Sequence, residues 1–194
     1  MKKSEERRNQ ILSAAFEAVK EHGFHAVTLQ VISDYGGFSK GVVSYYFKNK
    51  ESIFSELFRW LTDKIYHKEK YAVHEQETAE AKLKAYIYSV FISPEKNFSF
   101  YKVYLEFLAQ SPLNDEYKKT NIQFYNNCFE IAEHIIKTGI EQGVYSNSIN
   151  IKELSKTMRA IIDGCLIQWL MTADKDSHDR FRDNCLFSIS KLLS

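Results

Sequence analysis

Side chains suited to nucleic-acid chemistry cluster between Thr28 and Lys50. Thr28 and Ser39 each precede an apolar run, so we expect both hydroxyls to cap a helix N-terminus, where free amides also attract phosphate. Lys40 and Ser44 follow Ser39 on one predicted short helix and can reach base edges, with Lys40 the best candidate for guanine. Lys50 can bind a phosphate on the far side of the same groove. This pattern predicts contacts to double-stranded DNA.

Three further residues of that short helix fit the same chemistry. Tyr45 and Tyr46 can each donate one hydroxyl hydrogen bond to the DNA backbone while their rings pack on sugars or thymine methyl groups. Gly41 lets the helix backbone come close to the DNA. The alternative for either tyrosine taken separately is ordinary packing in the core of a small domain.

The elements that must position these residues are marked by glycines and apolar spacing. A helix beginning behind Thr28 is predicted to end at Gly36 and Gly37, where the absence of Cβ allows a sharp turn. A helix over residues 4–22 carries one apolar stripe and braces the pair. Together the three helices predict a helix-turn-helix unit.

These residues resemble the N-terminal domain of TetR-family transcriptional regulators, and the clear match covers about a quarter of the chain. The shared features are the threonine, a buried isoleucine, the glycine, the Ser-Lys-Gly start, the aromatic pair with its phenylalanine, and the Lys-x-Lys-Glu run. The chain departs at Ser33, where the family usually has alanine, and at Ser44, where it usually has a phosphate-binding tyrosine that Tyr45 and Tyr46 can replace. A looser match lies at 161–164.

The resemblance implies a homodimeric regulator that responds to a small-molecule effector, most often a repressor that binds a palindromic operator and is released by the effector. It also implies that the last two helices pair with their copies across a twofold axis. Those helices, over 151–171 and 177–193, carry more apolar surface than one layer of neighbours would cover. The alternative is that they close the core of a monomer.

Composition predicts an all-α fold of about nine helices. Hydrophobic residues make up 44% of 194 positions, enough for a real core, whereas only two prolines and seven glycines argue against a turn-rich sheet protein. We expect a helix-turn-helix DNA-binding domain over 1–47 and a helical ligand-binding and dimerisation domain over 48–194. The spacing predicts the other helices near 49–71, 94–110 and 115–142, with one more around Leu83 to Phe91.

Charge and cysteine content place the protein in a reducing compartment that contains DNA. Residues 1–50 carry eight Lys or Arg against five acids, although the whole chain is only +1. The three cysteines are widely separated without a C-x-x-C pair, the N-terminus lacks an apolar signal region, and no apolar stretch is long enough to span a bilayer. We therefore expect a cytoplasmic protein without membrane association.

Aromatic residues make up 14% of the chain and predict where an effector binds. In TetR-like proteins the helices that carry them surround a ligand pocket, so the resemblance implies a largely apolar or aromatic effector. For any single ring, ordinary core packing is the alternative. The predicted ligand-binding residues are Trp60, Phe91, Tyr101, Tyr104, Phe107, Tyr125, Phe129 and Trp169.

Catalytic and metal motifs are missing from the sequence. The six histidines form no H-E-x-x-H or Glu-x-x-His pair, and we interpret Glu130 and His134 as a solvated pair one helical turn apart in preference to a metal site. Neither a phosphate loop nor a nucleophile elbow occurs. The sequence therefore predicts no enzyme, no cofactor and no metal. The rival hypotheses are a helical protein-interaction scaffold without sequence-specific DNA binding and, behind it, a helical-bundle enzyme.

Overall fold

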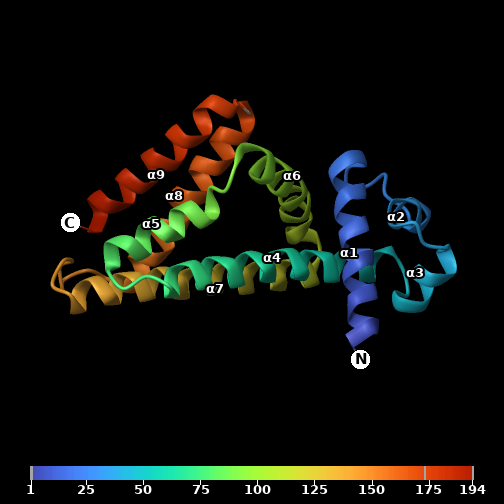
Figure 1. Ribbon diagram of the computed structural model, residues 1–194, viewed down its shortest axis with the longest axis horizontal. Coiled ribbons are helices and arrows are strands. Elements are labelled where there is room, and N and C mark those ends of the chain that lie inside the picture. Colours follow the sequence, from blue (N-terminus) through green and yellow to red (C-terminus); the bar gives the residue numbers. More distant parts are fainter. Residues whose placement is uncertain (1, 173, 194) are drawn as a thin grey trace. The chain divides into compact units, whose positions relative to one another are not determined.

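The computed structural model describes residues 2–172 and 174–193, which form nine α-helices and two short 3-10 helices with no strand (Figure 1). This confirms the predicted all-α class. The elements are α1 Lys2–His22, α2 Leu29–Gly36, α3 Lys40–Tyr46, α4 Lys50–His74, α5 Ala79–Val90, α6 Pro94–Gln110, η1 Ser111–Leu113, α7 Asp115–Glu141, α8 Ile151–Thr172, η2 Lys175–Ser177 and α9 His178–Leu193.

Contacts group these elements into two compact units. The N-terminal unit comprises the described residues up to Thr62 together with Lys102–Asn121. The C-terminal unit comprises Asp63–Tyr101 and the described residues from Ile122 onward. Helices α4, α6 and α7 therefore contribute to both units. The predicted domain boundary after residue 47 stays a prediction.

An aromatic cluster holds the N-terminal unit together. Phe24, in the segment between α1 and α2, lies 4.8 Å from Phe54 of α4 between ring centroids. Phe58, one turn further along α4, stacks on Phe107 of α6 at 4.9 Å, and Phe107 meets Tyr117 of α7 edge-on at 5.4 Å. All five rings are buried, and each such pair adds about 0.5–1.5 kcal/mol beyond simple burial. The first three turns of α4 are thus anchored on several helices.

A second anchor in this unit is the guanidinium of Arg8 on α1. It donates two hydrogen bonds to the Glu56 carboxylate on α4 and a third, of 3.1 Å, to the backbone oxygen of Tyr46 at the end of α3. Its plane also lies 4.5 Å from the centroid of the Phe47 ring. The hydrogen bond to Glu56 raises the pKa of Arg8. One side chain therefore joins α1, α3 and α4.

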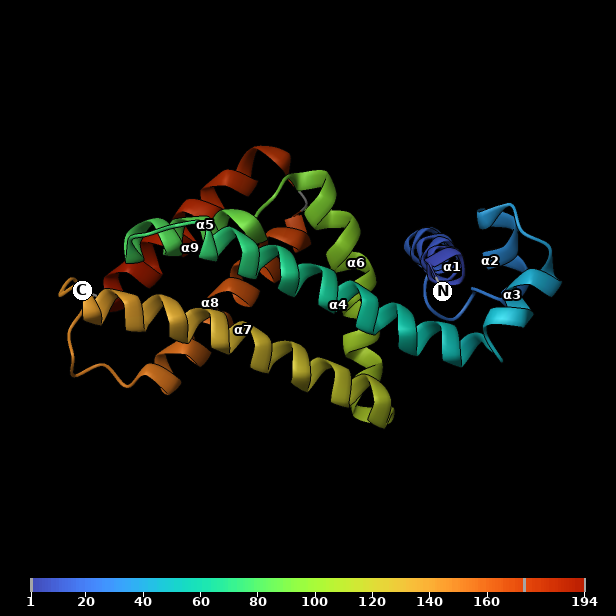
Figure 2. The same cartoon turned by 60° about the horizontal axis from the view of Figure 1, so that its bottom comes forward.

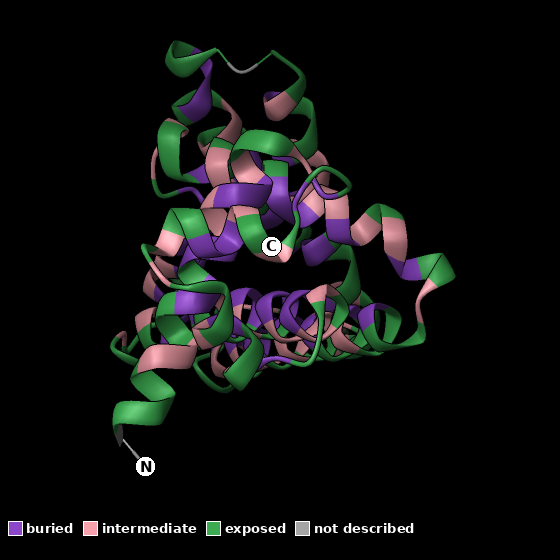
Figure 3. Cartoon of the chain, turned by 90° about the vertical axis from the view of Figure 1, so that its right-hand side faces the viewer, coloured by how far each residue is buried: buried purple, intermediate pink, exposed green. Residues whose placement is uncertain are grey.

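In the C-terminal unit, α9 packs against α8 and α5 (Figures 1 and 2). Buried residues recur at helical spacing on α8 and α9, and Figure 3 shows buried and exposed segments alternating along the helices, as amphipathic helices require. The buried apolar side chains of these two helices are Met158, Ile162, Leu166, Trp169, Cys185, Ile189 and Leu193.

His178, the first residue of α9, closes one end of this unit. Its side chain is buried, its Nε2 lies 3.0 Å from Asn97 Oδ1, and its ring meets that of Trp169 at 4.8 Å between centroids. Asn97 in turn accepts a hydrogen bond from the Ile92 amide and donates one to the Val90 carbonyl. The pair thus ties the end of α5 and the start of α6 to the start of α9.

Protonation of His178 is expected to destabilise the fold. Burial lowers its pKa below the ordinary value of 6.5, so the folded state favours the neutral imidazole whereas the unfolded state does not. This contribution to stability is fully present above about pH 6.5 and is lost as the pH falls from that value through the lowered pKa of the folded state. Urea unfolding at several pH values between 5 and 8 should show the decrease, and His178→Gln should reduce it. A decrease that is the same in His178→Gln and in the exposed control His67→Gln would contradict this account.

Loss of the Arg8 anchor is expected to loosen the N-terminal unit. Arg8→Met keeps the apolar stem but removes the ion pair and the bond to Tyr46, and because the pair is about one-third exposed we expect a loss of about 1 kcal/mol. Urea unfolding followed by circular dichroism measures it. Arg180→Met, an exposed position on α9, is the control and should leave the midpoint unchanged. Equal midpoints for the two variants would show that the anchor contributes nothing.

Candidate nucleic-acid interface

The turn between α2 and α3 is built as the sequence predicts. The Thr28 hydroxyl caps α2 by accepting a hydrogen bond of 3.3 Å from the Val31 amide. Gly37 ends the helix in the left-handed conformation, with φ of 63°, which glycine adopts without strain. A Cβ on Gly36 would lie 2.1 Å from the Phe38 ring, so a larger residue there would force that ring to move. These residues redirect the chain within a few positions.

Helix α3 is short, capped and anchored on one side. The Ser39 hydroxyl accepts a hydrogen bond of 3.4 Å from the Val42 amide, and the backbone N–H of Phe47 closes the other end on the Val43 carbonyl. Val43 and Phe47 are buried, whereas Val42 is only half-buried. Apolar anchorage on one side leaves the opposite side free for a ligand.

The exposed side of α3 carries the predicted DNA-binding residues. Lys40, Gly41, Ser44 and Tyr45 are exposed, as are the caps Thr28 and Ser39. Tyr45 is 82% exposed, so core packing does not account for it. Tyr46 is half-buried and its ring meets that of Tyr45 edge-on at 5.1 Å. Their roles in DNA binding stay predictions.

Lys50 is half-buried and hydrogen-bonded within the protein, unlike a lysine that is freely exposed to bind phosphate. Its Nζ donates hydrogen bonds of 2.9 Å to the Phe24 carbonyl and 3.3 Å to the His25 carbonyl, and it lies 4.9 Å from the Phe54 ring centroid. Partial burial lowers its pKa. The amino group therefore caps the segment between α1 and α2, and the predicted phosphate contact stays a prediction. Lys48, two residues earlier, is exposed and was not singled out from the sequence.

Arg7 was also missed by reasoning from the sequence. Its guanidinium lies 5.1 Å from the Phe38 ring centroid, and the residue lines a shallow open groove together with Ser39, Gly41 and Tyr45. A cation beside the exposed face of α3 suits a polyanionic partner. The Arg-Arg pair at positions 7 and 8 is visible in the sequence. Only the fold shows that Arg8 joins three helices whereas Arg7 lies beside the exposed face of α3.

A second polar site, absent from the predictions, lies inside the C-terminal unit. Glu69 of α4 and Arg159 of α8 are only 2% and 3% exposed. The guanidinium lies 2.6 Å from the Asp163 carboxylate one turn along α8, 3.9 Å from Glu69, and donates a hydrogen bond of 3.4 Å to the Cys128 sulfur on α7. Tyr86 of α5 is also buried here. We call Glu69, Tyr86, Cys128, Arg159 and Asp163 the core cluster.

The core cluster is incompletely satisfied. Arg159 Nε and the Tyr86 hydroxyl are buried and have no hydrogen-bond partner in the part of the chain that the structure describes. Burial raises the pKa of Glu69 to about 7, although nearby Arg159 opposes the shift. Burial also raises the pKa of the Cys128 thiol, which keeps it protonated and unreactive. Unpaired buried polar groups cost stability, so this cluster calls for a functional explanation.

The predicted ligand-binding aromatics are divided between the units. Trp60, Tyr104 and Phe107 belong to the N-terminal unit, where Phe107 is part of the aromatic cluster and the Tyr104 hydroxyl donates to Asn121 at 2.8 Å. Those in the C-terminal unit are Phe91, Tyr101, Tyr125, Phe129 and Trp169.

Each of these five has a packing role or a specific neighbour. Phe91 meets the His178 ring, Trp169 donates its Nε1 hydrogen to the Asp174 carbonyl, and Tyr125 stacks on Phe129 with centroids 6.2 Å apart. The buried Tyr101 lies close enough to the core cluster for Arg159 and Asp163 to influence its pKa. Effector binding by all eight stays a prediction.

Among residues 2–172 and 174–193, no group of three or more histidines, cysteines or carboxylates could hold a metal ion. In the same two stretches of chain, none of the helices has the length and apolar character needed to span a membrane.

Comparison with known proteins identifies the family. Residues 11–57 match the family of bacterial regulatory proteins of the tetR type. Residues 79–194, more than half of the chain, match the C-terminal region of BetI-type transcriptional repressors.

Relatives agree along most of their length. The fatty acid metabolism regulator protein of Bacillus subtilis is 27% identical over 177 residues, which are 90% of this chain and 89% of that protein. The regulator BetI of Pectobacterium carotovorum is 26% identical over 191 residues, 95% and 90% of the two chains.

Solved structures share the fold. A TetR transcription regulator from Haloarcula marismortui superposes with a TM-score of 0.86 at 22% identity, covering 97% of this chain and 98% of that one. A transcriptional regulator from Saccharomonospora viridis in complex with choline gives 0.86 at 25% identity, with 96% of each chain covered. The chain therefore belongs to the TetR family and is a DNA-binding transcriptional regulator.

Proposed function

We propose that the protein is a homodimeric repressor that binds a palindromic operator and leaves it when a small-molecule effector binds. In this proposal residues 1–47 read DNA and residues 48–194 bind the effector and form the dimer. The protein acts in the cytoplasm, by binding and not by catalysis. The observation that carries the proposal is the exposed polar face of α3, capped and anchored within the region that matches the family.

The exposed face of α3 suits the major groove. In this proposal Lys40 reaches a guanine edge, with Ser39 and Ser44 beside it, and Tyr45 packs on sugar or thymine methyl groups; the exposure of these side chains supports the proposal. The capped N-terminus of α2 at Thr28 offers amides to a phosphate. In a twofold dimer the two α3 helices must enter successive major-groove faces, about 34–36 Å or a multiple apart, which requires a palindrome.

Helices α8 and α9 are the proposed dimer interface. Their buried residues do close the core of the chain itself, yet α8 also exposes Met171 at 70% and α9 exposes Phe187 at 61%, with Leu192 and Ile167 partly exposed as well. Apolar side chains on two adjacent helices support an isologous interface in which each pair meets its copy.

The core cluster supports the proposed effector site. With Glu69 ionised, the two carboxylates and one guanidinium of the cluster carry a formal charge of −1, a form that a cationic ligand would stabilise. Tyr86, Tyr101 and the Phe124 ring, 5.0 Å from the Arg159 guanidinium, add aromatic groups close to these charges. A small ligand with a cationic head on an apolar body fits that combination. The choline complex of the Saccharomonospora relative agrees with such a head group, although the Bacillus relative is named for fatty acid metabolism. In this proposal α4 has two tilts, one that permits DNA binding and one that does not. The effector binds the second more tightly and so releases the DNA.

Operator recognition is tested by selecting bound fragments from random duplex DNA with the purified protein. We expect a palindrome, and affinity that falls linearly with the logarithm of salt concentration. Lys40→Ala should reduce the preference for the selected operator over random duplex by about tenfold, because base contacts are worth about 1–3 kcal/mol. Lys50→Ala should weaken all duplexes alike, and Lys152→Ala on α8 should change neither.

Equal loss of preference in Lys40→Ala and Lys50→Ala would contradict the assigned roles. No duplex binding even at low salt would favour the rival hypothesis, a helical protein-interaction scaffold.

Effector chemistry is tested by calorimetry with choline and, separately, with stearoyl-CoA as the rival probe. We expect choline to bind and to release the selected operator, and Glu69→Gln to weaken choline about tenfold because a buried charge partner is lost. Glu130→Gln, an exposed carboxylate on α7, is the matched control. Tight binding of stearoyl-CoA without choline binding would overturn the cationic assignment while leaving the DNA proposal intact.

A further inference from the structure

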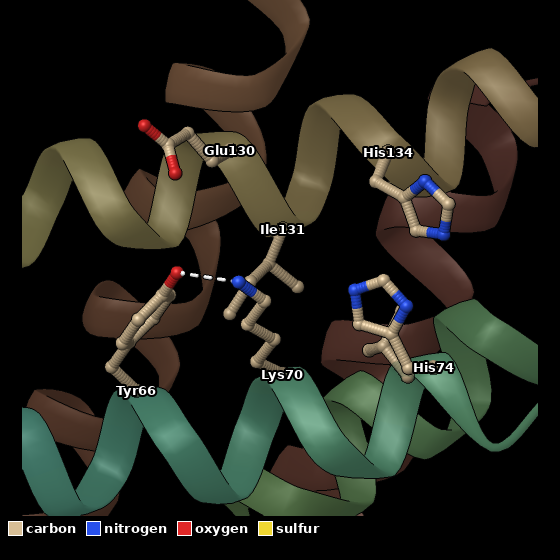
Figure 4. Close-up of a pocket in the computed structure, with 7 residues that line it drawn as sticks. Tyr66, Lys70, His74, Glu130, Ile131 and His134 are labelled. Atoms are coloured by element: carbon tan, nitrogen blue, oxygen red, sulfur yellow. Dashed lines mark hydrogen bonds between the residues drawn. The ribbon is translucent and has the colours of Figure 1, made fainter.

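A hollow of about 220 Å³ lies between α4 and α7 in the C-terminal unit (Figure 4). It contains no predicted DNA-binding or ligand-binding residue, and it shares no lining residue with the core cluster. Helix α4 supplies three side chains one turn apart and α7 supplies two, above an apolar floor. The lining residues are Tyr66, Lys70, Val73, His74, Glu130, Ile131 and His134.

Two hydrogen-bond donors at this hollow are available to a ligand. Lys70 Nζ is 3.1 Å from the Tyr66 hydroxyl, and among the described residues it has no carboxylate partner within ion-pair distance. His134 Nε2 is buried and has no hydrogen-bond partner in the same part of the chain. In the tautomer with a hydrogen on Nε2 this nitrogen donates, so an acceptor group of a ligand in the hollow would satisfy it.

The walls and floor of the hollow suit a small flat apolar body. The centroids of the His74 and His134 rings are 5.0 Å apart and their planes differ by 18°. Figure 4 shows the two rings lying opposite each other. Val73 and Ile131, which also line the hollow, are buried. The Tyr66 ring stands on the other side of Lys70 (Figure 4).

The charges around the hollow favour an anion over a cation. Burial lowers the pKa of His134, and Lys82, His74 and Lys137 lower it further, whereas Glu141 acts in the opposite direction. Lys70 adds a positive charge at the mouth, where Glu130 is exposed to solvent and turns its carboxylate away from the two rings (Figure 4). With cations on this many sides and only two imidazoles, the donor set is unsuited to a metal ion.

We propose that this hollow binds a small organic anion, a carboxylate on a short apolar or aromatic body. The carboxylate accepts hydrogen bonds from Lys70 Nζ and from an imidazole N–H of His134, and the body lies on Val73 and Ile131. Such a ligand would connect α4 directly to α7 at a place separate from the proposed effector site. Its binding does not depend on the proposed function.

The probe is benzoate, with benzamide as its uncharged counterpart and sodium chloride at equal ionic strength as the blank. Histidine-ring NMR signals, assigned with His74→Gln and His134→Gln, report binding. We expect benzoate to shift both signals in a saturable way. The unaltered protein should bind benzamide about tenfold more weakly than benzoate, and Lys70→Gln should bind benzoate about tenfold more weakly than the unaltered protein does. The exposed control Lys152→Gln should bind benzoate with unchanged affinity. Benzoate should bind more tightly at pH 6 than at pH 8, because an imidazolium carries a further donor and a positive charge.

Three outcomes would overturn the proposal. Benzamide or sodium chloride could shift the signals as benzoate does, which would leave no role for the carboxylate. Lys70→Gln could bind benzoate as the unaltered protein does. A stoichiometric, saturable response of both histidines to Zn²⁺, without any response to benzoate, would identify a metal site instead.

Discussion

A helix of seven residues is not stable in water by itself, so α3 exists only through the contacts that hold its ends and its inner side. The Ser39 hydroxyl satisfies its first turn, and buried Val43 and Phe47 fasten it to the N-terminal unit. Arg8 then binds the carbonyl of Tyr46 and the Glu56 carboxylate, which ties the last turn to α1 and α4. Because these anchors lie at the ends and on the inner side, the other side is exposed as a polar surface. In the proposed function, that constraint lets so short a helix present its side chains to bases.

The C-terminal unit contains charged side chains in its core. Arg159 lies 2.6 Å from Asp163, whereas Glu69 has only longer contacts, 3.9 Å to Arg159 and 4.0 Å to the Cys128 sulfur. A core designed only for stability would have apolar side chains at these positions, since replacing a buried ion pair by well-packed hydrophobic residues is often neutral or stabilising. Retention of charged groups here agrees with the proposed role of the cluster as the effector site. The same helix α4 carries Glu69 toward this core and Lys70 toward the hollow beside α7.

Much of the fold could be predicted because its signals are local. Pro94 at the first position of α6 and the Ser111-Pro112 stop give both ends of that helix, and Thr28, Ser39, Gly36 and Gly37 give the turn before α3. The core cluster could not be predicted, because its members come from four helices and no short-range pattern relates Glu69 to Arg159. The inward position of Lys50 was also hidden, since it depends on carbonyls 25 and 26 residues earlier in the chain. Periodicity shows which side of a helix is apolar, but it does not show which charged residue is buried with it.

The most direct test of the account is to place a photo-crosslinking benzoylphenylalanine at position 45, on the exposed face of α3, and to map the crosslinked nucleotides on a selected operator. The account predicts crosslinks at two symmetry-related positions, one in each half-site, on the major-groove side. The same group at position 88, on α5, should give none. Absence of crosslinks at position 45 on an operator that is fully bound, or crosslinks scattered equally along unrelated duplex, would show that α3 is not the reading helix.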